Sequence, residues 1–221
     1  MNRAAVCSHI EELGLVPVLR LPSAALVERA VEALLNGGVS IFEVTMTVPG
    51  AVDVIRTLSE RFGSRALVGA GTVLSASDAK ACIDAGARFI VSPGLDLATI
   101  EAAHARDVAI MPGVLTPTEV ITAWKAKADM VKIFPCSAVG GAKYLRALKG
   151  PFPDVKMLPT GGVNVTTAPE YIAAGAAALG IGSELVDRAV LEAGRDVELT
   201  ERARELVAVI RAARAKLRPT A

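Results

Sequence analysis

The chain has 221 residues, with 24 lysines and arginines against 23 aspartates and glutamates, so its formal net charge is only +1. This balance argues against a polybasic nucleic-acid-binding surface and against an acidic disordered tail. Hydrophobic residues make up 52% of the chain and charged residues 21%, a composition that excludes a largely disordered protein and provides for a large core. We expect a single domain over residues 1–221.

Membrane, metal and disulfide proteins are disfavoured as well. No stretch of about 18 residues is free of charges and helix breakers, and Glu11 and Glu12 precede any hydrophobic run, unlike in a secretory signal. The three cysteines form no CxxC pair, and the two histidines form no HExxH motif. We therefore expect a cytoplasmic protein without a metal site.

Short apolar runs alternate with longer amphipathic segments along the whole chain. Each short run is bounded by Gly, Pro or Asn, as is typical of parallel strands that are covered on both faces. We expect strands at residues 15–20, 40–46, 66–71, 88–93, 108–113, 130–135, 155–162 and 177–183. Helical patterns lie between them, most clearly at residues 23–36, 77–85 and 166–174, and a final charged helix is expected at about 196–216.

The spacing of these elements predicts the fold class. Eight strands that start about every 23 residues, joined by seven helical crossovers, indicate an α/β protein with a (β/α)8 TIM-barrel fold. A doubly wound nucleotide-binding sheet is disfavoured, because no GxGxxG motif follows the first strand.

In such a barrel, the chemistry lies at the carboxyl ends of the strands. Polar residues at these ends include Arg20, Glu43, Thr45, Thr72, Lys132, Thr160 and Ser183.

Lys132 and Glu43 carry the most information, because both lie inside apolar strands. Burial disfavours the ammonium form and yields a neutral amine that attacks carbonyl carbons, while a nearby carboxylate can relay protons. With no histidine available, this pair suits Schiff-base chemistry. The alternative interpretation is a structural ion pair, or a lysine that extends to solvent at a strand end.

Two glycine-rich turns follow the last two predicted strands. Gly161 and Gly162 belong to the segment TGGVN, and Gly182 and Ser183 belong to GIGS. Barrels commonly bind phosphate between these two turns. The alternative is that the glycines only make tight turns. Thr72 has a similar ambiguity, since its hydroxyl can hold a carboxylate or cap the next helix.

The segments EVTMTVP, GAGTV, VSPG, MPGVLTPTE, VKIFP and LPTGGVN occur in this order between about Val16 and Ser183. This series resembles the 2-keto-3-deoxy-6-phosphogluconate (KDPG) aldolase family, with its 4-hydroxy-2-oxoglutarate (KHG) and phosphogalactonate aldolase relatives. The resemblance implies a trimeric class I aldolase on a (β/α)8 barrel, without metal or cofactor.

By this resemblance, Lys132 forms the Schiff base and Glu43 is the general acid and base. Thr72 and Pro93 match positions around the bound pyruvate, and Thr160 joins this substrate-binding set. The glycine-rich turns (Gly161, Gly162, Gly182 and Ser183) match a phosphate cradle. Arg20 matches an arginine of the galactonate branch.

Thr47 departs from the family pattern. Phosphogluconate aldolases of the best-known kind have an arginine at the matching position, and this arginine binds the pyruvate carboxylate. A neutral hydroxyl cannot make the bidentate, charge-assisted contact that an arginine makes. Arg20 is the candidate to replace it.

The sequence thus predicts cleavage of a 2-keto-3-deoxy-6-phospho sugar acid to pyruvate and glyceraldehyde 3-phosphate, and of 4-hydroxy-2-oxoglutarate to pyruvate and glyoxylate. The expected partners are small-molecule substrates and further copies of the chain in a homotrimer, with no nucleic acid or membrane. Three alternatives stay open: a phosphogalactonate-specific aldolase, a phosphosugar isomerase or epimerase, and a non-catalytic sugar-acid-phosphate binder.

Overall fold

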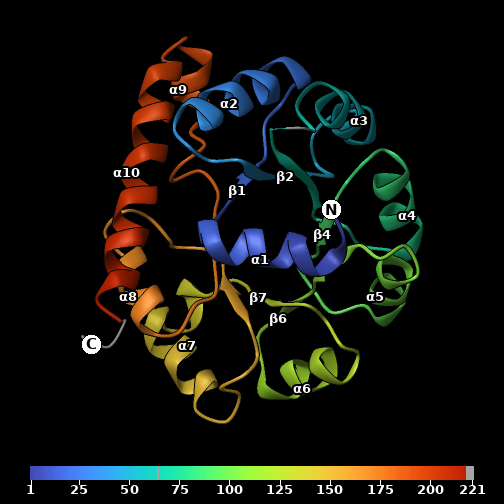
Figure 1. Ribbon diagram of the computed structural model, residues 1–221, viewed down its shortest axis with the longest axis vertical. Coiled ribbons are helices and arrows are strands. Elements are labelled where there is room, and N and C mark those ends of the chain that lie inside the picture. The colour runs from blue at the N-terminus through green and yellow to red at the C-terminus, as the bar shows by residue number, and fades with distance from the viewer. Residues whose placement is uncertain (64, 218–221) are drawn as a thin grey trace.

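The computed structural model describes residues 1–63 and 65–217, in which helices surround a set of parallel strands (Figure 1). Residue 64 and residues 218–221, which the expected single domain includes, lie outside the described residues.

The strands lie where the apolar runs predict them, although most are shorter. They are β1 (Leu15–Leu19), β2 (Ile41–Thr45), β3 (Leu67–Gly71), β4 (Phe89–Val91), β5 (Ala109–Met111), β6 (Gly113–Val114), β7 (Val131–Ile133), β8 (Met157–Pro159) and β9 (Leu179–Ile181). The run at residues 108–113 is divided at Pro112, because proline has no N–H to donate to a neighbouring strand. The Pro112 carbonyl still accepts a hydrogen bond of 2.9 Å from the backbone N–H of Lys132.

All strand pairs in the described residues are parallel. Six strands form a sheet in the order β5-β4-β3-β2-β1-β9, and three form a second sheet in the order β6-β7-β8. The first strand therefore lies between the second and the last. A parallel bridge between Thr160 and Gly180 connects the end of β8 to β9. These pairings confirm the expected parallel α/β fold.

The helices alternate with the strands. They are α1 (Arg3–Leu13), α2 (Ala24–Asn36), α3 (Ala51–Phe62), α4 (Ala76–Asp84), α5 (Leu97–His104), α6 (Pro117–Lys125), η1 (Ser137–Val139, a 3-10 turn), α7 (Ala142–Lys149), α8 (Ala168–Ala173), α9 (Arg188–Glu192) and α10 (Asp196–Ala215). The four helices singled out in the sequence correspond to α2, α4, α8 and α10. Ser23 caps α2 by accepting a hydrogen bond from the N–H of Leu26. Within the described part of the chain, no helix is long and apolar enough to cross a membrane.

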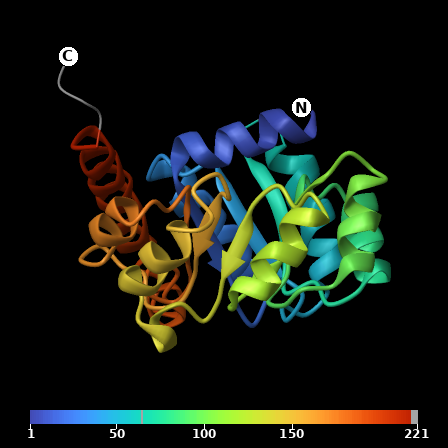
Figure 2. The ribbon, with the colours of Figure 1, turned by 90° about the horizontal axis from the view of Figure 1, so that it is seen from below.

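The N-terminal helix α1 was not expected from the sequence, and it lies across one end of the strands (Figure 2). Its residues Val6, Cys7 and Ile10 are buried in an apolar cluster with strand residues from all around the fold. The strand residues include Val16, Ile41, Leu67, Phe89, Met111 and Leu158, and Met130, which directly precedes β7, also belongs to the cluster. Because α1 directly precedes β1, it covers the amino ends of the strands, and the site described next lies toward their carboxyl ends.

Candidate active site

Lys132 and Glu43 come together in the structure, as the sequence predicts. Lys132 is the central residue of β7, Glu43 is the central residue of β2, and the Lys132 Nζ lies 3.7 Å from the Glu43 Oε1. The two residues are only 4% and 1% exposed. The expected alternative of a lysine that extends to solvent is therefore wrong. An isolated buried charge is costly, so two titratable groups in this position favour a functional role.

The Glu43 carboxylate has few hydrogen-bonding partners for a buried charged group. A separation of 3.7 Å is an ion-pair distance but too long for a hydrogen bond, and the Glu43 Oε1 has no hydrogen-bond partner among the described residues. Burial raises the pKa of Glu43 above the 4.5 of an ordinary glutamate, although the positive charges of Lys132 and Arg20 offset part of this effect. A carboxyl group with a raised pKa is suited both to giving and to taking protons during a reaction.

Gly71 and Phe134 border the buried pair of Lys132 and Glu43 on two sides. A Cβ atom at Gly71 would lie 2.4 Å from the Glu43 Oε1, so only glycine leaves room for the carboxylate in this position. On the other side, the Lys132 Nζ lies 5.3 Å from the centre of the Phe134 ring, which gives the amine an apolar, polarisable neighbour.

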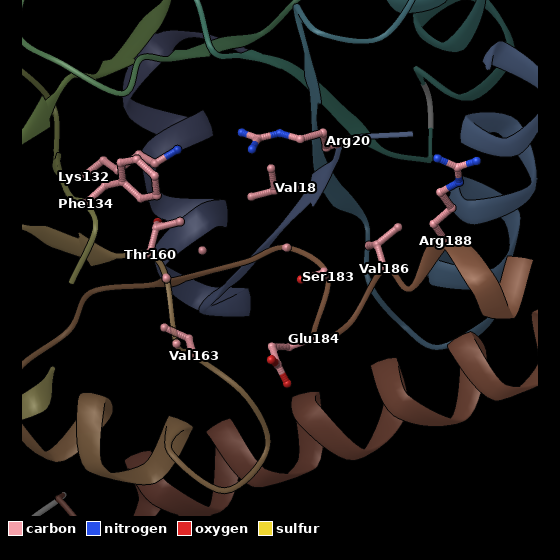
Figure 3. Close-up of a pocket in the computed structure, with 14 residues that line it drawn as sticks. Val18, Arg20, Lys132, Phe134, Thr160, Val163, Ser183, Glu184, Val186 and Arg188 are labelled. Atoms are coloured by element: carbon pink, nitrogen blue, oxygen red, sulfur yellow. The ribbon is translucent and has the colours of Figure 1, made fainter. Parts of the chain in front are cut away.

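Lys132 lies at one side of a pocket of about 300 Å³ (Figure 3). The predicted site residues in its lining are Arg20, Lys132, Thr160, Gly161, Gly162, Gly182 and Ser183. The sequence analysis missed the other lining residues, which are Val18, Phe134, Val163, Gly180, Glu184, Val186 and Arg188. Figure 3 shows the Arg20 side chain extending toward Lys132 across this space.

The two glycine-rich turns form one wall of the pocket. Gly161 and Gly162 have φ angles of 94° and 71°, which residues with a side chain rarely adopt. A Cβ at Gly162 would also lie 2.4 Å from the Cβ of Ser137, so the turn closes tightly against the segment after β7. Ser183 follows Gly182 at the end of β9. The turns that were predicted to bind phosphate thus face the same space as Lys132.

Four predicted residues lie outside the pocket lining: Glu43, which contacts the pocket through Lys132, and Thr47, Thr72 and Pro93. Thr72 directly follows β3 and has a φ of 58°, a strained value for a β-branched residue. Pro93 follows β4 in a turn in which the hydroxyl of Ser92 donates to the Gly94 carbonyl at 2.6 Å. Both residues lie at the carboxyl ends of their strands.

Thr47 is exposed, and its hydroxyl is 2.7 Å from the hydroxyl of Thr45. Thr45 donates its own proton to the Leu19 carbonyl at 3.1 Å. Since each hydroxyl has a single proton, Thr47 is the donor to Thr45. Thr47 therefore offers only lone pairs to a ligand and supplies no donor for a carboxylate.

Comparison with known proteins agrees with this geometry. The family model described as "KDPG and KHG aldolase" matches residues 6–203. The chain belongs to the KDPG and KHG aldolase family. It is 36% identical over 192 residues to the KHG/KDPG aldolase of Escherichia coli K12, and the match covers 87% of this chain and 90% of that protein.

Solved structures of aldolases have the same fold as this family member. The KDPG aldolase of Legionella pneumophila, with pyruvate captured as a covalent carbinolamine intermediate, has a TM-score of 0.82 at 31% identity, covering 87% of this chain and 93% of that one. The KDPG aldolase of Zymomonas mobilis ZM4 with 3-phosphoglycerate has a TM-score of 0.83 at 34% identity, covering 94% and 97%.

Proposed function

We propose that this chain is a class I aldolase, a lyase that cleaves a 2-keto-3-deoxy-6-phospho sugar acid to pyruvate and glyceraldehyde 3-phosphate. The observation that carries the proposal is the buried pair of Lys132 and Glu43, 3.7 Å apart at one side of a pocket with two glycine-rich turns in its wall. The covalent pyruvate intermediate of the Legionella relative supports the same chemistry.

We also propose that the strands close into a single (β/α)8 barrel, in which β5 and β6 count as one strand interrupted at Pro112. The pairing of β1 with β9 and the bridge between Thr160 and Gly180 support closure at the seam between the first and last strands. A closed barrel gathers the carboxyl ends of β2 and β7 around one site, which is the arrangement that the mechanism requires.

The proposed mechanism begins with transfer of a proton from the Lys132 ammonium to the Glu43 carboxylate, which leaves a neutral amine beside a protonated carboxyl group. The amine adds to the C2 ketone, while Glu43 gives a proton to the ketone oxygen and takes one from the nitrogen. Glu43 then protonates the resulting hydroxyl, which leaves as water and produces a protonated imine and a carboxylate. This step is general acid catalysis by a carboxyl group with a raised pKa.

The protonated imine then accepts electrons from the C3–C4 bond. Glu43 takes the C4 hydroxyl proton, the C3–C4 bond breaks, and glyceraldehyde 3-phosphate leaves an enamine on Lys132. Glu43 returns the proton to C3. Hydrolysis of the imine by water then releases pyruvate and restores both residues.

The substrate-binding roles follow from the lining of the pocket. We propose that Arg20 binds the pyruvate carboxylate, because it extends toward Lys132 (Figure 3) and because Thr47 donates its only proton to Thr45. Thr72, Pro93 and Thr160 would surround the three-carbon unit.

We propose that the phosphate binds at the two glycine-rich turns, in the cradle that Gly161, Gly162, Gly182 and Ser183 form. Backbone N–H groups in such turns are common anion ligands.

A phosphogalactonate preference is the second candidate, favoured by the position of Arg20 in the pocket and the lack of a cation at Thr47. Release of pyruvate from the gluconate and galactonate epimers, each with and without phosphate, distinguishes the two, and 4-hydroxy-2-oxoglutarate is assayed in parallel.

The Lys132→Met variant serves as the control for each substrate. Activity that survives this change would support a phosphosugar isomerase or epimerase instead, and tight binding without turnover would support a non-catalytic binder. A homotrimer and a cytoplasmic location also stay predictions. Sedimentation analysis of the purified protein tests the homotrimer.

A further inference from the structure

The pocket extends past the residues that the mechanism uses, to Arg188. Arg188 is the first residue of α9 and belongs to the pocket lining. In Figure 3 it lies on the far side from Lys132, and Arg20 lies between them. The pocket therefore has a second arginine at the end opposite to Lys132.

The backbone that carries Arg188 is firmly held. Leu185 and Val186 are buried, and their N–H groups both donate to the Gly182 carbonyl, at 3.0 and 2.9 Å. The Asp187 side chain accepts hydrogen bonds from the N–H groups of Ala189 and Val190. The position of Arg188 relative to Gly182 and Ser183 is thus fixed by the loop and does not depend on its own side chain.

The guanidinium keeps donors available for a ligand. Its Nε donates to the Glu192 Oε1 at 2.7 Å, and its two terminal nitrogens have no hydrogen-bond partner within residues 1–63 and 65–217. These two nitrogens carry four N–H groups in a plane that matches an oxyanion. Because the side chain is 63% exposed, little water has to be removed for it to bind one.

The cations in the pocket lining are Arg20, Lys132 and Arg188, and the lining also contains the carboxylate of Glu184. Glu43 pairs with Lys132 and Glu192 with Arg188, so Arg20 is the lining cation without a carboxylate partner among the described residues. The C1 carboxylate of a 2-keto acid is bonded to the C2 carbon that reacts with Lys132. The group that can reach the opposite end is therefore the phosphate on C6.

We infer that Arg188 is a specificity-determining residue that binds the distal phosphate of the substrate, together with the glycine-rich turns. The inference rests on the proposed function, because the ligand is placed by its attachment to Lys132. It adds a side-chain contact to a phosphate site that the sequence predicts from backbone groups alone.

The test compares the phosphorylated 2-keto-3-deoxy sugar acid with the same acid lacking phosphate. We expect Arg188→Gln to raise KM for the phosphorylated substrate about tenfold, the effect of losing a charged hydrogen bond, with kcat unchanged. KM for the unphosphorylated acid stays within about twofold of its original value, and Arg188→Lys lies between the two. The matched control is Arg195→Gln, since Arg195 is also exposed and paired with a glutamate but does not line the pocket.

A binding measurement makes the test independent of turnover. Calorimetry with glycerol 3-phosphate is expected to show about tenfold weaker binding to Arg188→Gln than to the unchanged protein or to Arg195→Gln. Equal binding by all three proteins, or equal losses of activity on both substrates, would overturn the role of Arg188. An unchanged protein that forms no pyruvate adduct at Lys132 would overturn the proposed function, while the calorimetry would still decide whether Arg188 binds phosphate.

Discussion

The Glu43 carboxylate lies 3.7 Å from the Lys132 amine, in a space that remains open because residue 71 is glycine. Removing two charges from water costs more than a loose ion pair returns, so this pair is a poor source of stability. Its burial, and the absence of a hydrogen-bond partner for the Glu43 Oε1 among the described residues, fit the proposed role of Glu43 in proton transfer.

The first prediction concerns Gly71. Gly71→Ala would place a methyl group 2.4 Å from the present position of the Glu43 Oε1, which forces the carboxylate away from Lys132. We expect kcat to fall on the order of 100-fold, and stability to fall by about 1–3 kcal/mol. Steady-state kinetics and urea unfolding measure both. Gly150→Ala is the control, because a Cβ atom there would lie 3.4 Å from the carbonyl oxygen of Ala147, an ordinary contact distance. An unchanged kcat in Gly71→Ala would show that catalysis does not depend on the position of the Glu43 carboxylate.

The second prediction concerns pH. Since burial raises the pKa of Glu43, the group is still protonated at pH values where an ordinary glutamate, with a pKa of 4.5, is ionised. The carboxylate form removes the C4 proton, so kcat should rise with pH through a pKa above 4.5. We expect Glu43→Gln to lower kcat roughly 10²–10⁴-fold and to abolish this rise of kcat with pH. A rise of kcat with pH that persists in the variant would assign the titration to another group.

The third prediction concerns the carboxylate of pyruvate. Arg20→Gln should weaken pyruvate binding about tenfold or more, because a charge-assisted contact is lost. Adding Thr47→Arg to this variant should recover part of the affinity, since the new guanidinium starts from the neighbouring strand end. The double-mutant cycle, measured by pyruvate binding, gives the interaction free energy. Normal pyruvate affinity in Arg20→Gln would remove Arg20 from the site.

The positions of the strands and the proximity of Lys132 and Glu43 could be predicted because they depend on local patterns. Lys132 and Glu43 each interrupt an apolar run, and the parallel topology brings the runs together. The division of a predicted strand at Pro112 was not foreseen. Proline fits an apolar run, but it has no backbone N–H to donate to a neighbouring strand.

The N-terminal helix and the far end of the pocket could not be predicted in the same way. The signals for α1 are weak: Asn2 as a cap, Gly14 as a left-handed stop, and three buried residues. The place of Arg188 in the pocket lining depends on the fold of the loop after Gly182, which no local pattern encodes. Thr47 could be recognised as unusual, but only the hydrogen bond to Thr45 shows why it offers no donor.

The fourth prediction tests the role of α1. Ile10 is completely buried against the amino ends of the strands. Ile10→Ala should lower the free energy of unfolding by about 2–5 kcal/mol, while kcat stays unchanged because the site lies at the other end of the strands. Ile121→Ala, at an exposed position, should change stability by no more than about 0.5 kcal/mol. A large loss of kcat in folded Ile10→Ala would mean that the two ends of the strands are coupled.

The central claim is that Lys132 forms a Schiff base with pyruvate. Treating the protein with pyruvate and borohydride reduces the imine to a stable amine, and peptide mass spectrometry locates the product. The account predicts a lactyl-sized mass increase on Lys132, with none in the Lys132→Met variant. The absence of an adduct, or an adduct on Lys125 or Lys143 instead, would contradict it.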